Sequence, residues 1–146
     1  MSLPQIKAPA GKILVVDDNP IIQRAVYFAL HDRGYVVLMC DELSEAMTIV
    51  RKERPDLILL DIHFPLDPTT GGSGVSDGFG ALAWMRRMDE IKDVPIVIIS
   101  SDDPASASPR AQAAGAAGYL HKPFDKGQLV LTVAELLAQK RSASAG

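Results

Sequence analysis

The sequence predicts an α/β fold, a three-layer sandwich in which helices cover both faces of a five-stranded parallel sheet. The apolar runs at residues 13–16, 57–60 and 96–99 show no polar alternation, which is typical of strands buried on both faces. Segments with helical spacing of apolar residues alternate with these runs along the chain, and such alternation indicates parallel strands joined by right-handed crossovers. A flavodoxin-like strand order, 2-1-3-4-5, is the expected five-stranded arrangement.

Turn and cap residues delimit the elements of the first half. Residues 1–11 are expected to be a flexible lead-in because they hold two prolines and a glycine. Asn19 is expected to cap a helix with Pro20 at its first position, and Gly34 closes that helix. Pro55 ends the next helix. The expected strands span residues 12–16, 35–40 and 57–60, and the second helix spans 44–54.

The second half begins with a polar, glycine-rich stretch at residues 66–76, which indicates an inserted surface loop. Residues 104–115 hold two prolines and few large apolar residues, so a short or broken helix starting near Pro109 is expected there. Asp125 and Gln128 have the spacing of a capping box that opens the last helix. The remaining expected elements are a helix at 79–88, strands at 96–99 and 117–121, and a tail at 139–146. Residues 12–138 are expected to form one domain, without a second.

Composition excludes several classes of function. The net charge of −3 and the 47% hydrophobic content give no general basis for nucleic-acid binding. The apolar runs are too short to cross a bilayer, and no signal peptide is visible. Cys40 is the only cysteine, so no internal disulfide can form, which is consistent with a cytoplasmic location.

Polar residues end four of the predicted strands at one edge of the sheet. Asp17 and Asp18 follow the first strand, Asp61 the third, Ser100 the fourth and Lys122 the fifth. In an open α/β sheet this edge forms the ligand crevice. Three carboxylates there repel one another by about 4 kcal/mol per pair at 4 Å, so they must bind a cation or raise a pKa. Their oxygen ligands suit magnesium, whereas the histidine spacing does not predict a zinc site.

These residues are what phosphoryl transfer requires. An aspartate can be the covalent acceptor, while a metal ion, a lysine and a hydroxyl neutralise the phosphoryl oxygens. Structural interpretations stay open beside this one. Asp61 could only start a turn, Ser100 could only cap a strand, and Lys122 could be a solvated charge.

Five motifs occur in the order typical of one family. They are Val15-Val16-Asp17-Asp18-Asn19, Leu59-Leu60-Asp61-Ile62-His63-Phe64-Pro65, Asp77-Gly78, Pro95-Ile96-Val97-Ile98-Ile99-Ser100-Ser101 and Gly118-Tyr119-Leu120-His121-Lys122-Pro123-Phe124. With these motifs the chain resembles a stand-alone response-regulator receiver domain of two-component signalling, over about residues 12–138.

The resemblance implies that Asp61 accepts a phosphoryl group from a sensor histidine kinase or phosphotransfer protein. Asp17, Asp18 and Asp61 would hold magnesium together with the carbonyl of His63, and Lys122 would contact a phosphoryl oxygen. Such a domain is a switch and not an enzyme in the usual sense, although it catalyses its own phosphoryl transfer and dephosphorylation.

The resemblance also implies the switch residues. Ser100 would be the switch hydroxyl, and Tyr119 the aromatic residue whose rotamer follows it. Pro123 would follow a cis peptide bond, and the positions of His63 and Asp102 would influence the lifetime of the phosphoryl group. Tyr119 could instead be ordinary strand packing, and Pro123 could simply start a turn.

The sequence departs from the family pattern in two places. The stretch at 66–76 is an insertion of roughly nine residues, which could be a lid over the crevice or a tolerated surface loop. The proline content of residues 104–115 makes the usual partner-docking surface uncertain.

Two other functions compete with the switch. A receiver scaffold that no longer switches could serve as a protein-binding module, and a phosphohydrolase could use an aspartyl-phosphate intermediate. The latter commonly needs a second aspartate where this chain has His63. A flavin binder of the same fold is disfavoured because Asp17 and Asp18 would repel a phosphate. The switch interpretation implies a separate output protein as partner, with no direct nucleic-acid contact and no membrane insertion.

Overall fold

A computed structural model describes residues 10–61 and 78–145. Its centre is one five-stranded sheet in the order β2-β1-β3-β4-β5, with every neighbouring pair parallel. The predicted α/β class and strand order are therefore confirmed. The strands are β1 (Lys12–Val16), β2 (Val36–Cys40), β3 (Leu57–Asp61), β4 (Ile96–Ser100) and β5 (Gly118–His121).

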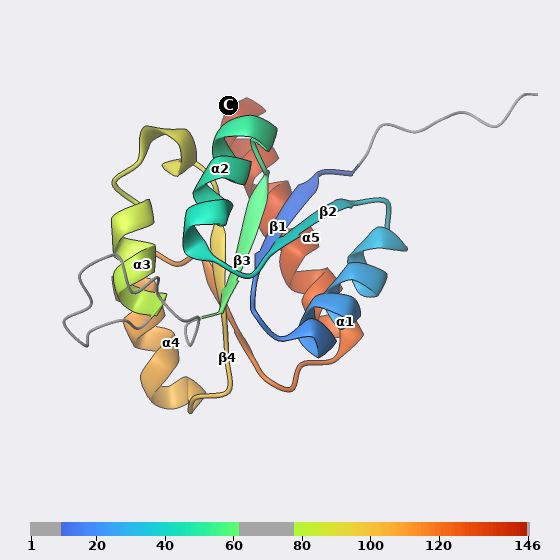
Figure 1. Ribbon diagram of the computed structural model, residues 1–146, viewed down its shortest axis with the longest axis vertical. Helices are drawn as coiled ribbons and strands as arrows, with labels where there is room; N and C mark the ends of the chain where they lie inside the picture. The colour runs from blue at the N-terminus through green and yellow to red at the C-terminus, as the bar shows by residue number, and fades with distance from the viewer. Residues whose placement is uncertain (1–9, 62–77, 146) are drawn as a thin grey trace, which may run out of the picture.

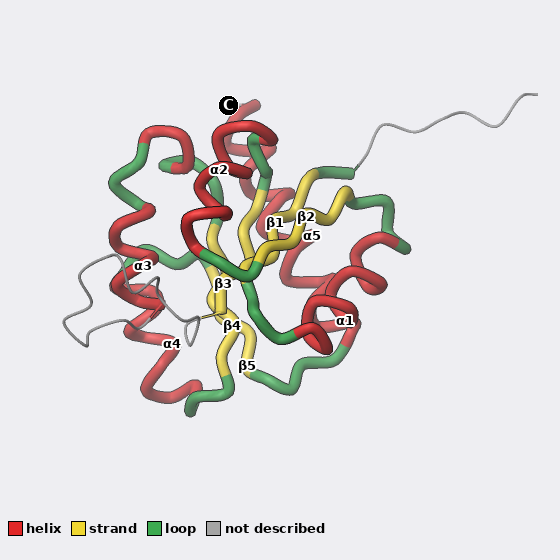
Figure 2. The backbone as a smooth tube through the Cα atoms, viewed as in Figure 1, coloured by secondary structure: helices red, strands yellow, loops and turns green. Residues whose placement is uncertain are grey.

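Helices cover both faces of the sheet (Figure 1). Two of them, α1 and α5, lie on one face, and α2, α3 and α4 lie on the other. The tube in Figure 2 shows the loops gathered at the two edges where strands begin and end. The helices are α1 (Pro20–His31), α2 (Leu43–Glu53), α3 (Gly78–Met85), the short 3-10 helix η2 (Asp89–Ile91), α4 (Pro104–Ala113) and α5 (Lys126–Ala145).

The helices on both faces of the sheet explain why the central strands are unbroken runs of apolar residues. Successive side chains of a strand point to opposite faces, so each central strand supplies both cores. In β3, Ile58 and Leu60 pack on the side of α2–α4, while Leu57 and Leu59 pack on the side of α1 and α5. All four are fully buried, and a polar residue in either set would lose its hydration.

Caps at the helix starts agree with the sequence. Asn19 Oδ1 accepts from the Ile21 amide at 2.9 Å, with Pro20 as the first helical residue. Asp125 Oδ1 accepts from the Gln128 amide at 2.6 Å at the start of α5. Each carboxylate or amide oxygen satisfies an amide that has no partner within its helix.

The segment after β4 differs from the expectation of a short or broken helix starting near Pro109. Helix α4 is regular and begins at Pro104, because Asp103 caps it by accepting from the Ala105 amide at 3.2 Å. Pro109 lies inside the helix, where it removes one backbone donor. The buried side chains of Ala107 and Ala111 show that small residues suffice for this contact with the core.

Two other boundaries differ. Helix α5 continues to Ala145, so most of the predicted tail at residues 139–146 is helical. The helix predicted at residues 79–88 is shorter at its C-terminal end, since α3 ends at Met85, and the separate 3-10 helix η2 begins at Asp89. Arg86 lies between them and donates to the carbonyls of Gly115 and Ile91, which holds the chain in a turn.

Candidate functional site at the C-terminal edge of the sheet

Three carboxylates converge where β1 and β3 end. Oxygens of Asp17, Asp18 and Asp61 all lie within 4.8 Å of one another. Asp17 is fully buried and Asp61 is 5% exposed, while Asp18 is exposed. The predicted acidic cluster is therefore formed, with two acids below the surface and one at its opening.

Strand alternation explains which side chains meet. Asp17 and Asp61 continue the face of β1 and β3 that carries Val15 and Leu59, on the side of α1 and α5. Lys122 follows β5 two residues after Leu120, which packs on that same side. Because residues two apart share a face, the two acids and the lysine reach one crevice.

The ammonium of Lys122 lies between the buried carboxylates. Its Nζ is 3.1 Å from Asp17 Oδ2 and 3.5 Å from Asp61 Oδ2. The Lys122 side chain is 18% exposed, so water screens these attractions only in part. The lysine thus partly offsets the repulsion between the two acids, which at 4.8 Å is roughly 3–4 kcal/mol at an effective dielectric near 20.

Two neighbours of Asp17 that sequence reasoning did not assign to the site hold its backbone and side chain. The amide of Asn19 donates to Asp17 Oδ1 at 2.8 Å, and Gln23 Nε2 donates to the Asp17 carbonyl at 2.5 Å. Gln23 lies one turn into α1, on the side that faces β1. The sequence signal for this contact was that Gln23, a polar residue, stands four positions after the helix cap Asn19.

Burial raises the pKa of Asp17, and the charge of Asp61 raises it further. The Asn19 amide and Lys122 act in the opposite direction without restoring the ordinary value of 3.8. Burial is the largest cause because a fully enclosed carboxylate loses its hydration. Further positive charge in the crevice would therefore stabilise the ionised form.

Ser100 and Tyr119 belong to the opposite face of the sheet. Ser100 is fully buried, and its Oγ accepts from the Asp102 amide at 2.9 Å. Tyr119 packs against the core under α2–α4, and its hydroxyl donates to the Asp102 carbonyl at 3.0 Å. Both side chains therefore hold the same residue of the loop between β4 and α4.

Of the remaining predicted site features, the structure describes the bond before Pro123 but not His63 or the insertion. The peptide bond between Lys122 and Pro123 is cis. His63 and the insertion at residues 66–76 lie outside the described residues.

A search of family models finds the response regulator receiver domain over residues 13–134. The chain belongs to this receiver family. The match begins at the second residue of β1, includes the other four strands and ends within α5. The alternation of strands and helices that the sequence predicted is therefore that of a receiver domain.

Curated relatives of this receiver include Protein PilH and several transcriptional regulatory proteins. Protein PilH of Pseudomonas aeruginosa is 29% identical over 128 residues, which cover 88% of this chain and 98% of PilH. The phosphate regulon transcriptional regulatory protein PhoB of Escherichia coli is 30% identical, over 85% of this chain and 50% of PhoB. The chain thus spans about half the length of several transcriptional regulators that it matches, and nearly the whole of PilH.

Solved structures have the same fold. A response regulator from Chloroflexus aurantiacus has a TM-score of 0.78 and 28% identity, covering 90% of this chain and 99% of its own. The chemotaxis response regulator CheY4 of Vibrio cholerae has a TM-score of 0.72 and 30% identity, covering 86% and 97%. Among the described residues of this receiver, no helix has the length and hydropathy needed to cross a bilayer.

The donor set of the receiver crevice fits a divalent cation. Three carboxylates within 4.8 Å of one another supply hard oxygen ligands, which magnesium prefers. One of these acids is exposed, so an ion could enter from solvent and keep water ligands on that side. Lys122 supplies a single positive charge near the three acids, so the cluster retains negative charge that a bound cation would neutralise.

Proposed function

We propose that this receiver is a phosphoacceptor switch. Asp61 takes a phosphoryl group from a histidine kinase or phosphotransfer protein in a magnesium-dependent reaction, and the modified protein changes its binding to a separate output protein. The observation that carries the proposal is the position of Lys122 Nζ, within 3.5 Å of both buried aspartates. An ammonium held there can contact an oxygen of a phosphoryl group attached to Asp61.

The reaction forms one bond and breaks another. An Asp61 carboxylate oxygen attacks the phosphorus of a phosphohistidine, the phosphorus–nitrogen bond breaks, and the imidazole leaves with the bonding electron pair and takes up a proton. Asp17 and Asp18 would hold the metal ion with Asp61, and the ion would neutralise negative charge on the phosphoryl oxygens. The Lys122 ammonium would then contact an oxygen of the phosphoryl group instead of the Asp61 carboxylate. It would therefore still offset negative charge in the crevice.

The hydrogen bonds at Asp102 support a route from the acceptor to the surface. If the Ser100 hydroxyl turns to donate to a phosphoryl oxygen, its bond from the Asp102 amide is weakened. The Asp102 carbonyl is the partner of the Tyr119 hydroxyl, so movement of this loop releases the tyrosine. The receiver would then populate a second arrangement of the loop and of α4.

The exposed apolar residues of α1 support a protein donor. Ile21 is 76% exposed, and its amide donates to Asn19, whose own amide contacts Asp17. Phe28 is 56% exposed and lies two helical turns further, on the same side of α1. We expect I21S to slow transfer from a kinase that phosphorylates this receiver, without changing the reaction with a small phosphodonor. L131S is the matched control, because Leu131 on α5 is 59% exposed.

The direct test uses acetyl phosphate and intact mass. Wild-type protein incubated with magnesium should gain the mass of one phosphoryl group, and chelation of the magnesium should prevent the gain. D61N should gain none, whereas D89N, which changes an exposed aspartate of η2, should react like the wild type. Absence of an adduct on wild type would instead favour the non-switching binding module.

A further inference from the structure

A groove lined by both charged and apolar residues lies at the opposite edge of the sheet. It has a volume of about 710 Å³, within the range of small-molecule sites. Pro95, just before β4, and Ala117, just before β5, form part of its wall. The five residues of β4 separate this base groove from the acidic crevice by roughly 16 Å, so the two sites are distinct.

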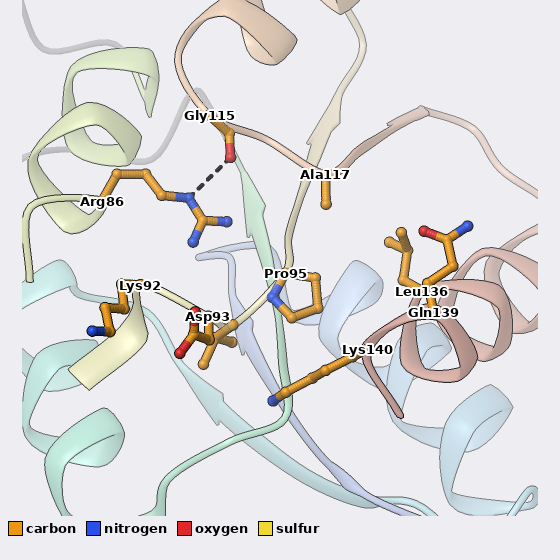
Figure 3. Close-up of a pocket in the computed structure, with 10 residues that line it drawn as sticks. Arg86, Lys92, Asp93, Pro95, Gly115, Ala117, Leu136, Gln139 and Lys140 are labelled. Atoms are coloured by element: carbon orange, nitrogen blue, oxygen red, sulfur yellow. Dashed lines mark hydrogen bonds between the residues drawn. The ribbon is translucent and has the colours of Figure 1, made fainter. Parts of the chain in front are cut away.

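Residues with cationic side chains line the base groove from different parts of the chain. Arg86 follows α3, Lys92 follows η2, and Lys140 belongs to α5. Figure 3 shows Arg86 and Lys140 pointing toward the cavity from opposite sides, with Pro95 between them, whereas the ammonium of Lys92 points away from it. Asp93 is the one acidic residue among the described lining residues, and outside the lining Lys140 Nζ lies 4.0 Å from Asp56 Oδ1 and 3.4 Å from the Asp56 carbonyl. Arg86 and Lys140 therefore supply positive charge on both sides of the groove, which Asp93 and Asp56 offset in part.

Arg86 is fixed in place before any ligand arrives. Its Nε donates to the Gly115 carbonyl at 2.9 Å, and Nη1 donates to the Ile91 carbonyl at 3.0 Å. A Cβ at position 115 would lie 2.9 Å from Arg86 Cγ. The Arg86 side chain can therefore pass over residue 115 only because that residue is a glycine. Arginine has five N–H donors, and those beyond the two used here remain for a ligand. A guanidinium held in this way loses little freedom on binding.

The wall between the cations is apolar. Val94, Pro95, Ala117 and Leu136 line it, and a flat apolar group can lie against such a surface. We propose that the base groove binds a small phosphomonoester with a flat aromatic ring, of about the size of a mononucleotide. The phosphoryl group, with a charge of about −1.5 to −2, would lie between Arg86 and Lys140, and the face of the ring would cover Pro95 and Leu136.

The test is a titration followed by amide NMR, without magnesium, using adenosine monophosphate as the probe. The amides of Asp93, Gly115 and Gln139 should shift. Adenosine lacks the anion and ribose 5-phosphate lacks the flat aromatic ring, so each should bind at least about tenfold more weakly. The same titration of D61N should give the same shifts, because the acceptor site is not involved.

Variants locate the charge contacts. K140A should raise the Kd of adenosine monophosphate about fivefold, and K140R should retain most of the affinity. K92A should have a smaller effect than K140A, because the Lys92 ammonium points away from the groove. K126A, at the other end of α5, is the matched control and should bind like the wild type. The proposal is overturned if the groove amides do not shift, if K140A binds unchanged, if adenosine binds as tightly as its monophosphate, or if the shifts are confined to the acidic crevice.

Discussion

Replacement of Lys122 by methionine tests the electrostatics of the crevice, independently of phosphorylation. The substitution keeps an apolar stem of similar length and removes the ammonium that contacts Asp17 at 3.1 Å and Asp61 at 3.5 Å. Both carboxylates are buried, with side-chain exposures of 0% and 6%. The variant therefore leaves two buried negative charges facing each other.

The distances and burial at Lys122 set limits on how much free energy of unfolding K122M loses. At an effective dielectric near 20, each attraction to Lys122 is about 5 kcal/mol before screening and desolvation are subtracted. Removal of one partner of a buried pair costs about 3–5 kcal/mol in practice. Protonation of one aspartate sets a ceiling, since raising its pKa from 3.8 to 7 corresponds to about 4 kcal/mol. We therefore expect K122M to lose 3–4 kcal/mol, or roughly 10 °C in Tm.

The pH dependence has a definite sign. Burial already raises the pKa of Asp17 above its ordinary value in the wild type, and K122M removes the ammonium that acts in the opposite direction, so the folded-state pKa of Asp17 should rise further. Such groups contribute stability below the unfolded pKa, and that contribution is lost as pH rises through the folded pKa. The deficit of K122M relative to wild type should thus be largest near neutral pH and should shrink toward about pH 4.

The assay is urea denaturation followed by far-UV circular dichroism, with and without magnesium. Magnesium should stabilise K122M more than wild type, because it replaces positive charge that the variant lacks. K126M is the control, since the pair between Lys126 and Asp32 is 59% exposed on each side and contributes little. A loss below about 1 kcal/mol for K122M, or equal stabilisation of both proteins by magnesium, would refute the reasoning.

Three further predictions concern the rest of the fold. Burial raises the pKa of the Cys40 thiol to about 12, so alkylation of native protein at pH 8, followed by intact mass, should be slow, and rapid labelling would contradict this. P109A should stabilise the protein by about 1–3 kcal/mol in denaturant titration, because it restores the donor for the Ala105 carbonyl in α4; an unchanged midpoint would show that the helix has adapted. G115A should destabilise by about 1–3 kcal/mol in the same assay, since φ is +107° and the new methyl would meet Arg86, and full stability would contradict that contact.

Much of the fold could be predicted because local chemistry and global packing agree. The runs at residues 57–60 and 96–99 are apolar on both faces, and only a sheet covered by helices on both sides hides them. Asn19 and Asp125 are caps whose effect is confined to one helical turn. These features depend on neighbours in the chain, so the sequence carries them directly.

The sequence predicted only a short or broken helix after β4, starting near Pro109, and missed that the helix is regular and begins at Pro104. Its stability comes from contacts that local propensity does not describe. Pro104 and Pro109 indicate a broken segment when local propensity is considered alone. The cap by Asp103 and the burial of Ala107 and Ala111 offset that propensity, and tertiary packing is a larger contribution than helix propensity.

For the candidate site, the sequence alone determined which residues stand at the strand ends: Asp17, Asp18, Asp61, Ser100 and Lys122. Only the tertiary structure decided how they are grouped, with the buried acids and Lys122 on one face of the sheet and Ser100 with Tyr119 on the other. It alone revealed the base groove, which Arg86, Lys92 and Lys140 line from distant parts of the chain. The physical reason is that charge interactions depend on separation in space, which local patterns along a chain do not encode.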